Sequence, residues 1–382
     1  MSECWSFHNP VSIHFGEGAV EAFFTSNPYR RMLLVTTPGM MRRGTVKWLE
    51  TMVKGCIEGI YHDVTPNPDI ASLDALAARY RGSEVPDAII ALGGGSAIDT
   101  AKVLGAQLGG GGFSLRGHFI EKAPLPPITP VPVIAIPTTS GTGSEVTPFA
   151  TVWDAAAGKK YSLAGTWMFP LVALLVPRLT MELPWEVTLS TGLDALCQGF
   201  ESLWNRNATP VSIGFAERAV AQSWAVLSQG RRVLASESLR AELMEASLLS
   251  GLAISQTRTA LCHSISYPIT ARYGVPHGLA CAFTMPSVLR FNAVADDGRL
   301  ARFACSMGYA DCAAMADALG ALLQSCGISE LLRGFSLSAK ELSSLAHEMI
   351  TPGRADNNLR AVGAAEVEGI VSESLRASGL PA

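Results

Sequence analysis

The chain has 382 residues, of which 48% are hydrophobic and 16% are charged. This length and apolar content predict a globular protein of about two domains, and they exclude a mainly disordered chain. The formal net charge of −4 gives no electrostatic reason to expect nucleic acid or an anionic membrane as a partner.

Membrane insertion and export are not expected either. No apolar run approaches the roughly 20 residues that span a bilayer. The first residues lack the basic-then-apolar pattern of a secretory signal, so we expect a cytoplasmic protein. The eight cysteines are scattered without a CxxC pair, which is typical of reduced thiols. Cys197 and Cys262 are interpreted as small core residues.

The first part of the chain alternates short apolar strands with helical patterns. A turn at Pro66-Asn67-Pro68 separates two such units. Strands are predicted over Val11–Gly16, Arg31–Pro38 and near Tyr61, and helices over Met40–Lys54 and Ile70–Arg81.

A glycine-rich turn follows the next apolar strand, Ala88–Leu92. Gly93-Gly94-Gly95-Ser96 leads into a helix, and Ser96 with Asp99 has the spacing of a capping box. Glycines allow backbone N–H groups to approach a phosphate, and a helix N-terminus supplies partial positive charge. The spacing differs from GxGxxG, so a tight turn that caps a βα unit is the alternative interpretation of this motif alone.

A second loop rich in hydrogen-bond donors follows the strand Val131–Pro137. The flexible run Gly109–Gly112 and the rigid connector Pro124–Pro132 precede it. The loop Thr138–Glu145 suits ribose, amide or phosphate, although it also fits an ordinary Ser/Thr turn. Two such loops at strand ends favour a nucleotide crevice.

The second half of the chain is predicted to be all-helical. Strand-like runs stop near Pro177, and Ala/Leu/Ser-rich stretches such as Glu186–Trp204, Pro210–Gln229 and Leu239–Ala271 take over. We therefore expect an α/β domain over 1–180 and a helical domain over 181–382, with the site in a cleft between them.

Four residues of the helical half form a candidate metal site. Asp194 and Gln198 are one helical turn apart, and His263 and His277 are two of only seven histidines. Carboxylate and amide oxygens with two imidazole nitrogens suit a divalent ion such as Fe, Zn, Mn or Ni. On spacing alone, an Asp/Gln pair of this kind is more often a solvated helix face.

Taken in order, these motifs resemble those of the iron-containing (group III) alcohol dehydrogenases over essentially the whole chain. The motifs that carry the resemblance are Phe15–Ala19, Gly93–Lys102, Thr138–Thr147, Thr191–Leu196, His263, Pro276–Ala280 and Asp356–Arg360.

The resemblance implies a Rossmann-like parallel-sheet domain, an all-α metal domain with dehydroquinate synthase-like architecture, and nicotinamide-dependent aldehyde reduction or alcohol oxidation. It also implies a homodimer that uses Fe²⁺, with Zn²⁺ as the alternative. Asp194, Gln198, His263 and His277 would hold the metal and act in catalysis. The cofactor would contact Thr37, Asn67, Gly94, Gly95, Ser96, Asp99, Thr138, Thr139 and Thr142.

Three positions depart from the family pattern. Gln198 stands where a histidine ligand is usual, and Tyr267 stands where a second histidine follows the third ligand. Thr37 replaces the acidic residue that reads the ribose 2′-hydroxyl, so we expect NADPH to be used at least as well as NADH. Tyr267 and metal-bound water are the candidate proton donors.

The substrate is expected to be a small anionic aldehyde. Gln198 and the opening Trp5–Val11 are most similar to the phosphonoacetaldehyde reductases of phosphonate metabolism. Arg258 lies five residues before His263 in what is predicted to be one helix, about 140° round its axis, and is expected to bind the anion. Lys160 is the second candidate.

Three alternative functions remain open at this point. A general small-chain alcohol dehydrogenase would share the family. A lyase similar to dehydroquinate synthase would need a more basic pocket, and net consumption of NADPH would exclude it. A protein that binds metal or nucleotide without catalysis is conceivable because of Gln198, and turnover of any small aldehyde would exclude it.

Overall fold

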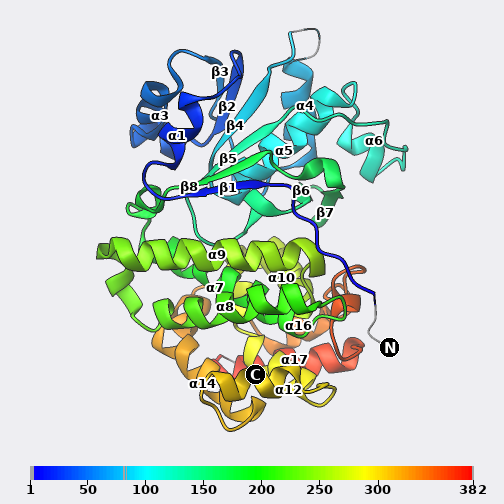
Figure 1. Cartoon of the computed structure of the whole chain (residues 1–382). Helices are drawn as coiled ribbons and strands as arrows, with labels where there is room; N and C mark the ends of the chain where they lie inside the picture. Colours follow the sequence, from blue (N-terminus) through cyan, green and yellow to red (C-terminus); the bar gives the residue numbers. More distant parts are fainter. Residues whose placement is uncertain (1–3, 81, 83, 381–382) are drawn as a thin grey trace. The chain divides into compact units, whose positions relative to one another are not determined.

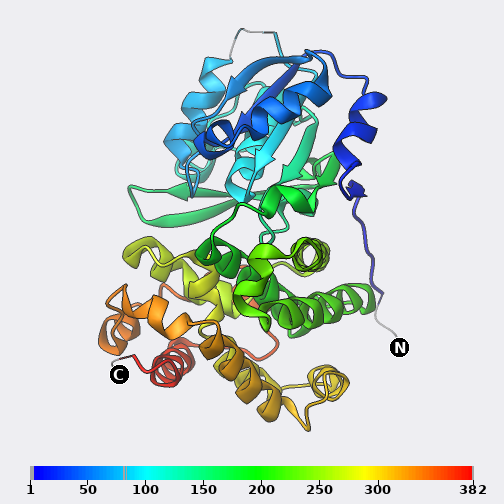
Figure 2. The same cartoon turned by 90° about the vertical axis from the view of Figure 1, so that its left-hand side faces the viewer.

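The computed structural model describes residues 4–80, 82 and 84–380, and the chain divides into two compact units. The first unit is Asn9–Glu182. The second contains the described residues up to His8 and those from Leu183 onward. Figures 1 and 2 show that the first unit is built on a sheet and that the second is helical.

A parallel six-stranded sheet forms the centre of the first unit, in the order β1-β8-β5-β4-β2-β3. β2, β4, β5 and β8 are buried along their whole length, as their continuous apolar sequences predict for a sheet covered on both faces. The strands are β1 (Ser12–Phe15), β2 (Met32–Thr36), β3 (Ile57–Tyr61), β4 (Ala88–Gly93), β5 (Val133–Pro137) and β8 (Val172–Leu175).

Helices cover both faces of this sheet, because alternate side chains of each strand point to opposite sides. Leu34 and Ile90 pack with α1 and α3 in one core, whereas Leu33 and Ile89 pack with α4 and α5 in the other. The helices of this unit are α1 (Ala19–Thr25), α2 (Pro38–Arg42), α3 (Thr45–Val53), α4 (Ile70–Arg79), α5 (Gly95–Gly109) and α6 (Leu115–Phe119).

Two predictions about these elements need correction or qualification. The single helix expected over Met40–Lys54 is interrupted at Gly44, whose φ of 74° lies in the left-handed region and ends the first helical segment. α4 ends at Arg79, and Arg81, the predicted end, lies outside the described residues.

The order of the strands creates a switch point between β2 and β4. The chain leaves β2 toward β3 on one side and returns to β4 on the other. In open parallel sheets, ligands bind beyond the carboxyl ends of strands at such a point. Thr37 directly follows β2, and the glycine turn directly follows β4.

The sequence analysis did not predict one structure of this unit, an antiparallel hairpin. β6 (Phe149–Asp154) pairs with β7 (Lys159–Ala164) in register, with Trp153 opposite Lys160. The hairpin is separate from the main sheet, and it is joined to α5 by contacts of Ala150 and Val152 with Val103 and Ala106. Short 3₁₀ segments η1 (Ser144–Val146) and η2 (Thr166–Met168) flank it, and a third, η3 (Pro177–Thr180), follows β8.

The second unit is built around the buried helix α7 (Trp185–Leu203), whose Phe200 stacks in the core on Trp204, the residue that follows the helix. The other helices are α8 (Pro210–Leu227), α9 (Glu237–Thr257), α10 (Leu261–Tyr273), α11 (His277–Ala282), α12 (Met285–Ala293), α13 (Arg299–Ser306), α14 (Cys312–Ser325), α15 (Ile328–Arg333), α16 (Ala339–Ser344) and α17 (Ala364–Ala377), with 3₁₀ segments η4 (Gly230–Ala235) and η5 (Ala355–Asn357).

The helix predicted over Leu239–Ala271 is in fact two helices, which corrects the geometry assumed for Arg258. α9 ends at Thr257 and α10 begins at Leu261. Arg258 adopts φ 60° and ψ 177°, which no helix contains, and its carbonyl accepts a hydrogen bond from Asn205 Nδ2. The offset of about 140° from His263 therefore does not apply, since the two residues do not share a helix.

The predicted fold class is confirmed: one unit is a parallel α/β structure and the other is helical. Within the described residues, no helix combines the length and the apolar character that are needed to cross a bilayer.

Candidate metal and nucleotide sites

The glycine turn and the threonine-rich loop pack directly against each other in the first unit. A Cβ atom on Gly94 would lie 3.0 Å from Thr139 Oγ1, and one on Gly95 would lie 2.7 Å from Thr142 Oγ1. The Thr138 N–H donates to the Gly93 carbonyl over 3.0 Å. Side chains at 94 and 95 would therefore displace the second loop, which gives these glycines a packing role in addition to any phosphate contact.

Thr37 lies at the same end of the sheet. A Cβ atom on Gly93 would be 3.7 Å from Thr37 Cγ2, so the residue that follows β2 contacts the turn that follows β4. Thr37 Oγ1 also accepts from Met40 N and caps α2. Asn67 is exposed, with φ 57°, in the connection between β3 and α4. The structure thus brings Thr37 to the two loops and places Asn67 after the neighbouring strand.

The predicted capping box of Ser96 and Asp99 is wrong. Gly94 is the N-cap of α5, and Ser96 already lies inside the first turn, where it cannot cap. The Asp99 carboxylate instead accepts hydrogen bonds from Ser144 Oγ and from Thr151 N, the latter over 2.8 Å. Asp99 therefore fastens α5 to the threonine-rich loop and to β6.

Lys102, a residue that the sequence analysis did not single out, binds the backbone of the same loop. Its buried ammonium donates to the carbonyls of Ser144 and Thr147 over 3.0 and 2.9 Å, and also to that of Phe149. Burial lowers the pKa of Lys102 to about 8, while the nearby carboxylates of Asp99 and Glu145 act in the opposite direction. A single buried cation thus organises the loop that follows β5.

Glu145, in the same loop, is expected to make the stability of the protein depend on pH. Burial raises the pKa of its carboxyl group to about 7, above the ordinary value of 4.5. Between these two values the unfolded chain loses a proton that the folded chain keeps, so this contribution to stability is complete below pH 4.5 and is lost as the pH rises through 7. In wild type this loss should lower the free energy of unfolding by about 3 kcal/mol as the pH rises. Glu145→Gln cannot titrate, so we expect it to lack this decline.

Urea unfolding at pH 5 and pH 7.5 measures this effect. Glu121→Gln is the matched control, because Glu121 is an exposed carboxylate that pairs with Arg116. An identical pH dependence in wild type and Glu145→Gln would show that Glu145 does not titrate in this range.

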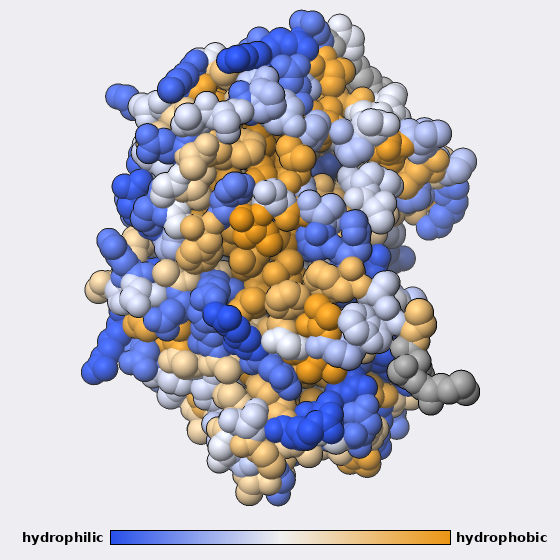
Figure 3. Space-filling view, in the orientation of Figure 1, coloured by the Kyte–Doolittle hydropathy of each residue, from blue (hydrophilic) through white to orange (hydrophobic). Residues whose placement is uncertain are grey.

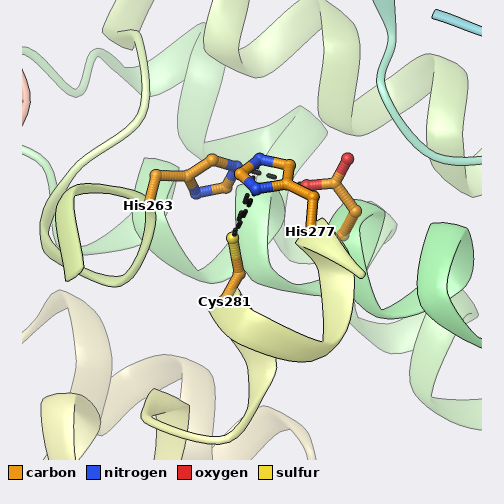
Figure 4. Close-up of side chains that lie close together, drawn as sticks. His263, His277 and Cys281 are labelled. Atoms are coloured by element: carbon orange, nitrogen blue, oxygen red, sulfur yellow. Dashed lines mark hydrogen bonds and ion pairs between the residues drawn. The ribbon is translucent and has the colours of Figure 1, made fainter. Parts of the chain in front are cut away.

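In the second unit, α7, α10 and α11 bring together three of the four predicted metal ligands. His263 Nε2 lies 3.2 Å from Asp194 Oδ1, and the rings of His263 and His277 are 5.2 Å apart and nearly perpendicular. Figure 4 shows the imidazoles of His263 and His277 close together, with Cys281 beside them. Ligand atoms of Asp194, His263, His277 and Cys281 all lie within 4.8 Å of one another.

Gln198, the fourth predicted ligand, is buried one turn after Asp194 on α7. Its Oε1 accepts a hydrogen bond from Ser250 Oγ over 3.0 Å, which fixes the direction of the amide. An amide oxygen has two lone pairs, so it can accept a hydrogen bond and bind a metal at the same time.

Glu201 orients His263, and sequence reasoning missed it. Its carboxylate lies 2.7 Å from His263 Nδ1 and also accepts from the backbone N–H groups of Ala260 and His263, over 2.7 and 3.0 Å. The Nδ1–H of His263 therefore donates to Glu201, and Nε2, which faces Asp194, is the nitrogen that can bind a metal. The signal in the sequence is the spacing: Glu201 follows Asp194 by seven residues, on the same face of α7.

Cys281 is the second residue that was missed, although it follows His277 by one helical turn. Its Sγ lies 3.8 Å from both nitrogens of His277. Burial acts to raise the pKa of this thiol, but hydrogen bonding with Cys197 and the charges of His263 and His277 hold it well below the ordinary value. Cys197 and Cys262 are buried core residues, as interpreted from the sequence.

The donor set fits a divalent transition metal. Metal–ligand bonds of about 2.0–2.3 Å place donors on opposite sides of an ion up to about 4.5 Å apart, close to the span of the cluster. A carboxylate, two imidazoles and an amide oxygen suit Fe²⁺ or Zn²⁺, and a nearby thiolate adds a softer donor. The glycine turn at the start of the 15-residue helix α5 likewise fits a pyrophosphate.

The two candidate anion-binding residues belong to different units. Lys160 lies on β7 with its ammonium 5.7 Å from the centre of the Trp153 ring. Arg258 lies between α9 and α10, and burial, followed by the charge of Arg354, lowers its pKa. Tyr267, the candidate proton donor, stacks on His277 with 6.2 Å between ring centres.

Comparison with known proteins identifies the class of fold first. Sulfoacetaldehyde reductase from Bifidobacterium kashiwanohense, solved in complex with NAD+, superposes with a TM-score of 0.88 at 29% identity, covering 97% of this chain and 99% of that one. This chain therefore shares the fold of that reductase.

Family profiles and sequence relatives then identify the family. The profile of iron-containing alcohol dehydrogenase matches residues 10–177, and that of the family's C-terminal domain matches 188–375. The 1-propanol dehydrogenase of Salmonella typhimurium is 31% identical over 79% of this chain and 80% of its own length. The chain belongs to the iron-containing alcohol dehydrogenase family.

One relative is similar over a shorter region. The phosphonoacetaldehyde reductase of Streptomyces viridochromogenes is 40% identical over 238 residues, which are 61% of this chain and 59% of that protein. The match therefore spans less than two thirds of that relative.

Proposed function

We propose that this protein is a metal-dependent NADPH-linked reductase of small anionic aldehydes, with phosphonoacetaldehyde as substrate and 2-hydroxyethylphosphonate as product. The observation that carries the proposal is the convergence of Asp194, His263 and His277 on one point of the helical unit. The similarity to reductases of phosphonoacetaldehyde and sulfoacetaldehyde supports an anionic substrate.

Asp194, Gln198, His263 and His277 are proposed to hold Fe²⁺, with Zn²⁺ as the alternative. A bound divalent ion supplies Lewis-acid polarisation of the aldehyde carbonyl, and the nicotinamide supplies the hydride. Glu201 holds the His263 ring so that Nε2 faces the site. Around the cofactor, Gly94, Gly95 and Ser96 are proposed to bind the pyrophosphate, while Thr138, Thr139 and Thr142 position ribose and nicotinamide.

The preference for NADPH is proposed to depend on Thr37. A neutral residue after β2 does not repel a 2′-phosphate, as an acidic one would. Thr37→Asp should favour NADH over NADPH by ~1–2 kcal/mol in the ratio of kcat/KM values. Because aspartate also caps helices, α2 should keep its start.

Thr37→Asn is the control, since it caps the helix without a charge and should leave the cofactor preference unchanged. Equal ratios for Thr37→Asp and wild type would show that Thr37 does not face the 2′ position.

Arg258 is proposed to bind the anionic group of the substrate. Its left-handed backbone, φ 60°, costs about 1–3 kcal/mol for a residue with a side chain, and such strain is concentrated at functional sites. Loss of one charged hydrogen bond should cost ~1.5–3 kcal/mol, so Arg258→Ala should lower kcat/KM for phosphonoacetaldehyde roughly 10- to 150-fold and leave propanal unaffected.

Arg258→Gly separates this effect from backbone strain. Glycine relieves the strain but removes the same guanidinium, so it should show the same loss for phosphonoacetaldehyde. Equal losses with both aldehydes would make Arg258 a structural residue. Lys160 is the second proposed anion ligand. The kcat/KM of Lys160→Ala is measured with the same two aldehydes.

A general alcohol dehydrogenase is the second candidate function, favoured by the similarity to the Salmonella 1-propanol dehydrogenase. A panel of aldehydes, assayed with NADPH and with NADH after metal reconstitution, separates the two. Activity that is highest with uncharged aldehydes would establish the second function.

We also propose a cytoplasmic homodimer. Ile13 and Phe15 of the edge strand β1 are 38% and 44% exposed, and apolar surface gathers near this strand in Figure 3. An exposed edge strand with apolar side chains favours association with a second copy. Light scattering of the purified protein measures its oligomeric state.

A further inference from the structure

We propose that Arg354 is a second specificity-determining residue for the anionic group of the substrate, and that Tyr267 positions it beside the metal ligand His277. This inference rests on the proposed function and adds a residue to its substrate site. Arg354 Nε lies 3.2 Å from Tyr267 Oη, and the Tyr267 ring stacks on the His277 ring at an interplanar angle of 25°. Two contacts therefore connect this guanidinium to the metal cluster.

The loop that carries Arg354 is fastened to the segment that carries Arg258. Asn357 Nδ2 donates to the carbonyls of Thr259 and Gly353, each over 2.9 Å. Arg354 Nη1 donates to the Gly353 carbonyl over 2.8 Å. These bonds fix the guanidinium of Arg354 near the break between α9 and α10.

The two arginines lie close enough to repel each other. The charge of Arg354 contributes, after burial, to the lowered pKa of Arg258. Among the ion pairs formed by the described residues, none includes Arg354. Like charges held together in a partly buried place are stabilised by an anion between them, and a guanidinium can pair two oxygens of a tetrahedral oxyanion.

The charge of the oxyanion distinguishes the substrate classes. A phosphonate carries up to two negative charges near neutral pH, whereas a sulfonate carries one. Two guanidinium groups match a doubly charged group better than a singly charged one. The geometry thus favours a phosphonate on a short aldehyde over a sulfonate of the same length.

Three variants test the inference. Arg354→Ala removes the cation, and Tyr267→Phe keeps the ring stacked on His277 but removes the hydroxyl that holds Arg354. Arg272→Ala is the matched control, because Arg272 is on the same helix as Tyr267, is exposed and pairs with Glu348. Each is assayed for kcat and KM with phosphonoacetaldehyde, sulfoacetaldehyde and propanal, and for binding of methylphosphonate by calorimetry.

Arg354→Ala is expected to lower kcat/KM at least 10-fold for phosphonoacetaldehyde, mainly through KM, less for sulfoacetaldehyde, and under 2-fold for propanal. Tyr267→Phe should show a smaller loss in the same order, and Arg272→Ala should match wild type. Equal losses for all three aldehydes in Arg354→Ala, or an unchanged KM of that variant for phosphonoacetaldehyde, would overturn the inference.

Methylphosphonate binding separates this inference from the proposed function. If wild type reduces no anionic aldehyde but binds methylphosphonate at least 10-fold more tightly than Arg354→Ala does, the proposed substrate fails and the anion site stands. If methylphosphonate binds both proteins equally, or neither, the anion site fails, whatever the aldehyde assays show.

Discussion

His277→Ala is expected to abolish both metal binding and aldehyde turnover while leaving the protein folded. His277 is half-buried on the first turn of α11, where it contacts Ser266, Cys281 and the rings of His263 and Tyr267, so its removal breaks little else. A divalent ion in this cluster has few ligands. Losing one imidazole should therefore lower metal affinity by more than the 10- to 100-fold that is typical when a residue hydrogen-bonded to a ligand is changed. Elemental analysis after dialysis measures the metal.

His263→Ala should lose the metal as well, but it also leaves the buried Glu201 carboxylate without its imidazole partner, so some loss of stability is expected. His347→Ala, at an exposed position of the same unit, is the control and should keep metal and activity. Gln198→His should retain the metal, with a shift toward Zn²⁺. Full metal content in both the His263 and His277 variants would rule out this site.

Glu201→Gln is expected to weaken metal binding 10- to 100-fold and to destabilise the helical unit by about 1–3 kcal/mol. The carboxylate accepts from two backbone N–H groups and faces the protonated Nδ1 of His263. An amide keeps one acceptor oxygen but points an NH₂ group at a donor, so at least one buried N–H loses its partner. The His263 ring then loses the bond that fixes its orientation.

Competition between the protein and a chelator measures the metal affinity of this variant, and thermal unfolding measures its stability. Glu245→Gln is the control, because Glu245 lies at the surface of α9 in contact with Arg218. An affinity within 2-fold of wild type would show that Glu201 serves the fold and not the metal.

The sequence predicted most of the fold because its strands are continuous apolar runs that end at glycine, proline or threonine turns. β2, β4 and β5 lie within one or two residues of the predicted runs. The hairpin of β6 and β7 was missed, because the mostly half-buried strand β7 contains lysine, tyrosine and serine and lacks a clear apolar alternation. The split at Gly44 was missed because the apolar period continues across it.

The site was predicted in part. Asp194, His263 and His277 were found from residue type and order, and the structure brings them together. Glu201 and Lys102 act through neighbours that are distant in sequence, which spacing within one helix cannot show. The helix assumed to carry both Arg258 and His263 failed for the same reason. A bond from Asn205, 53 residues earlier, supports the break.

Steady-state oxidation of NADPH with phosphonoacetaldehyde, by the same preparation stripped of metal and reconstituted with Fe²⁺, tests the central claim most directly. The predicted result is turnover only after reconstitution, with a kcat/KM for phosphonoacetaldehyde at least 10-fold above that for propanal. Two results would contradict it: equal rates with and without metal, or a reconstituted enzyme that prefers propanal.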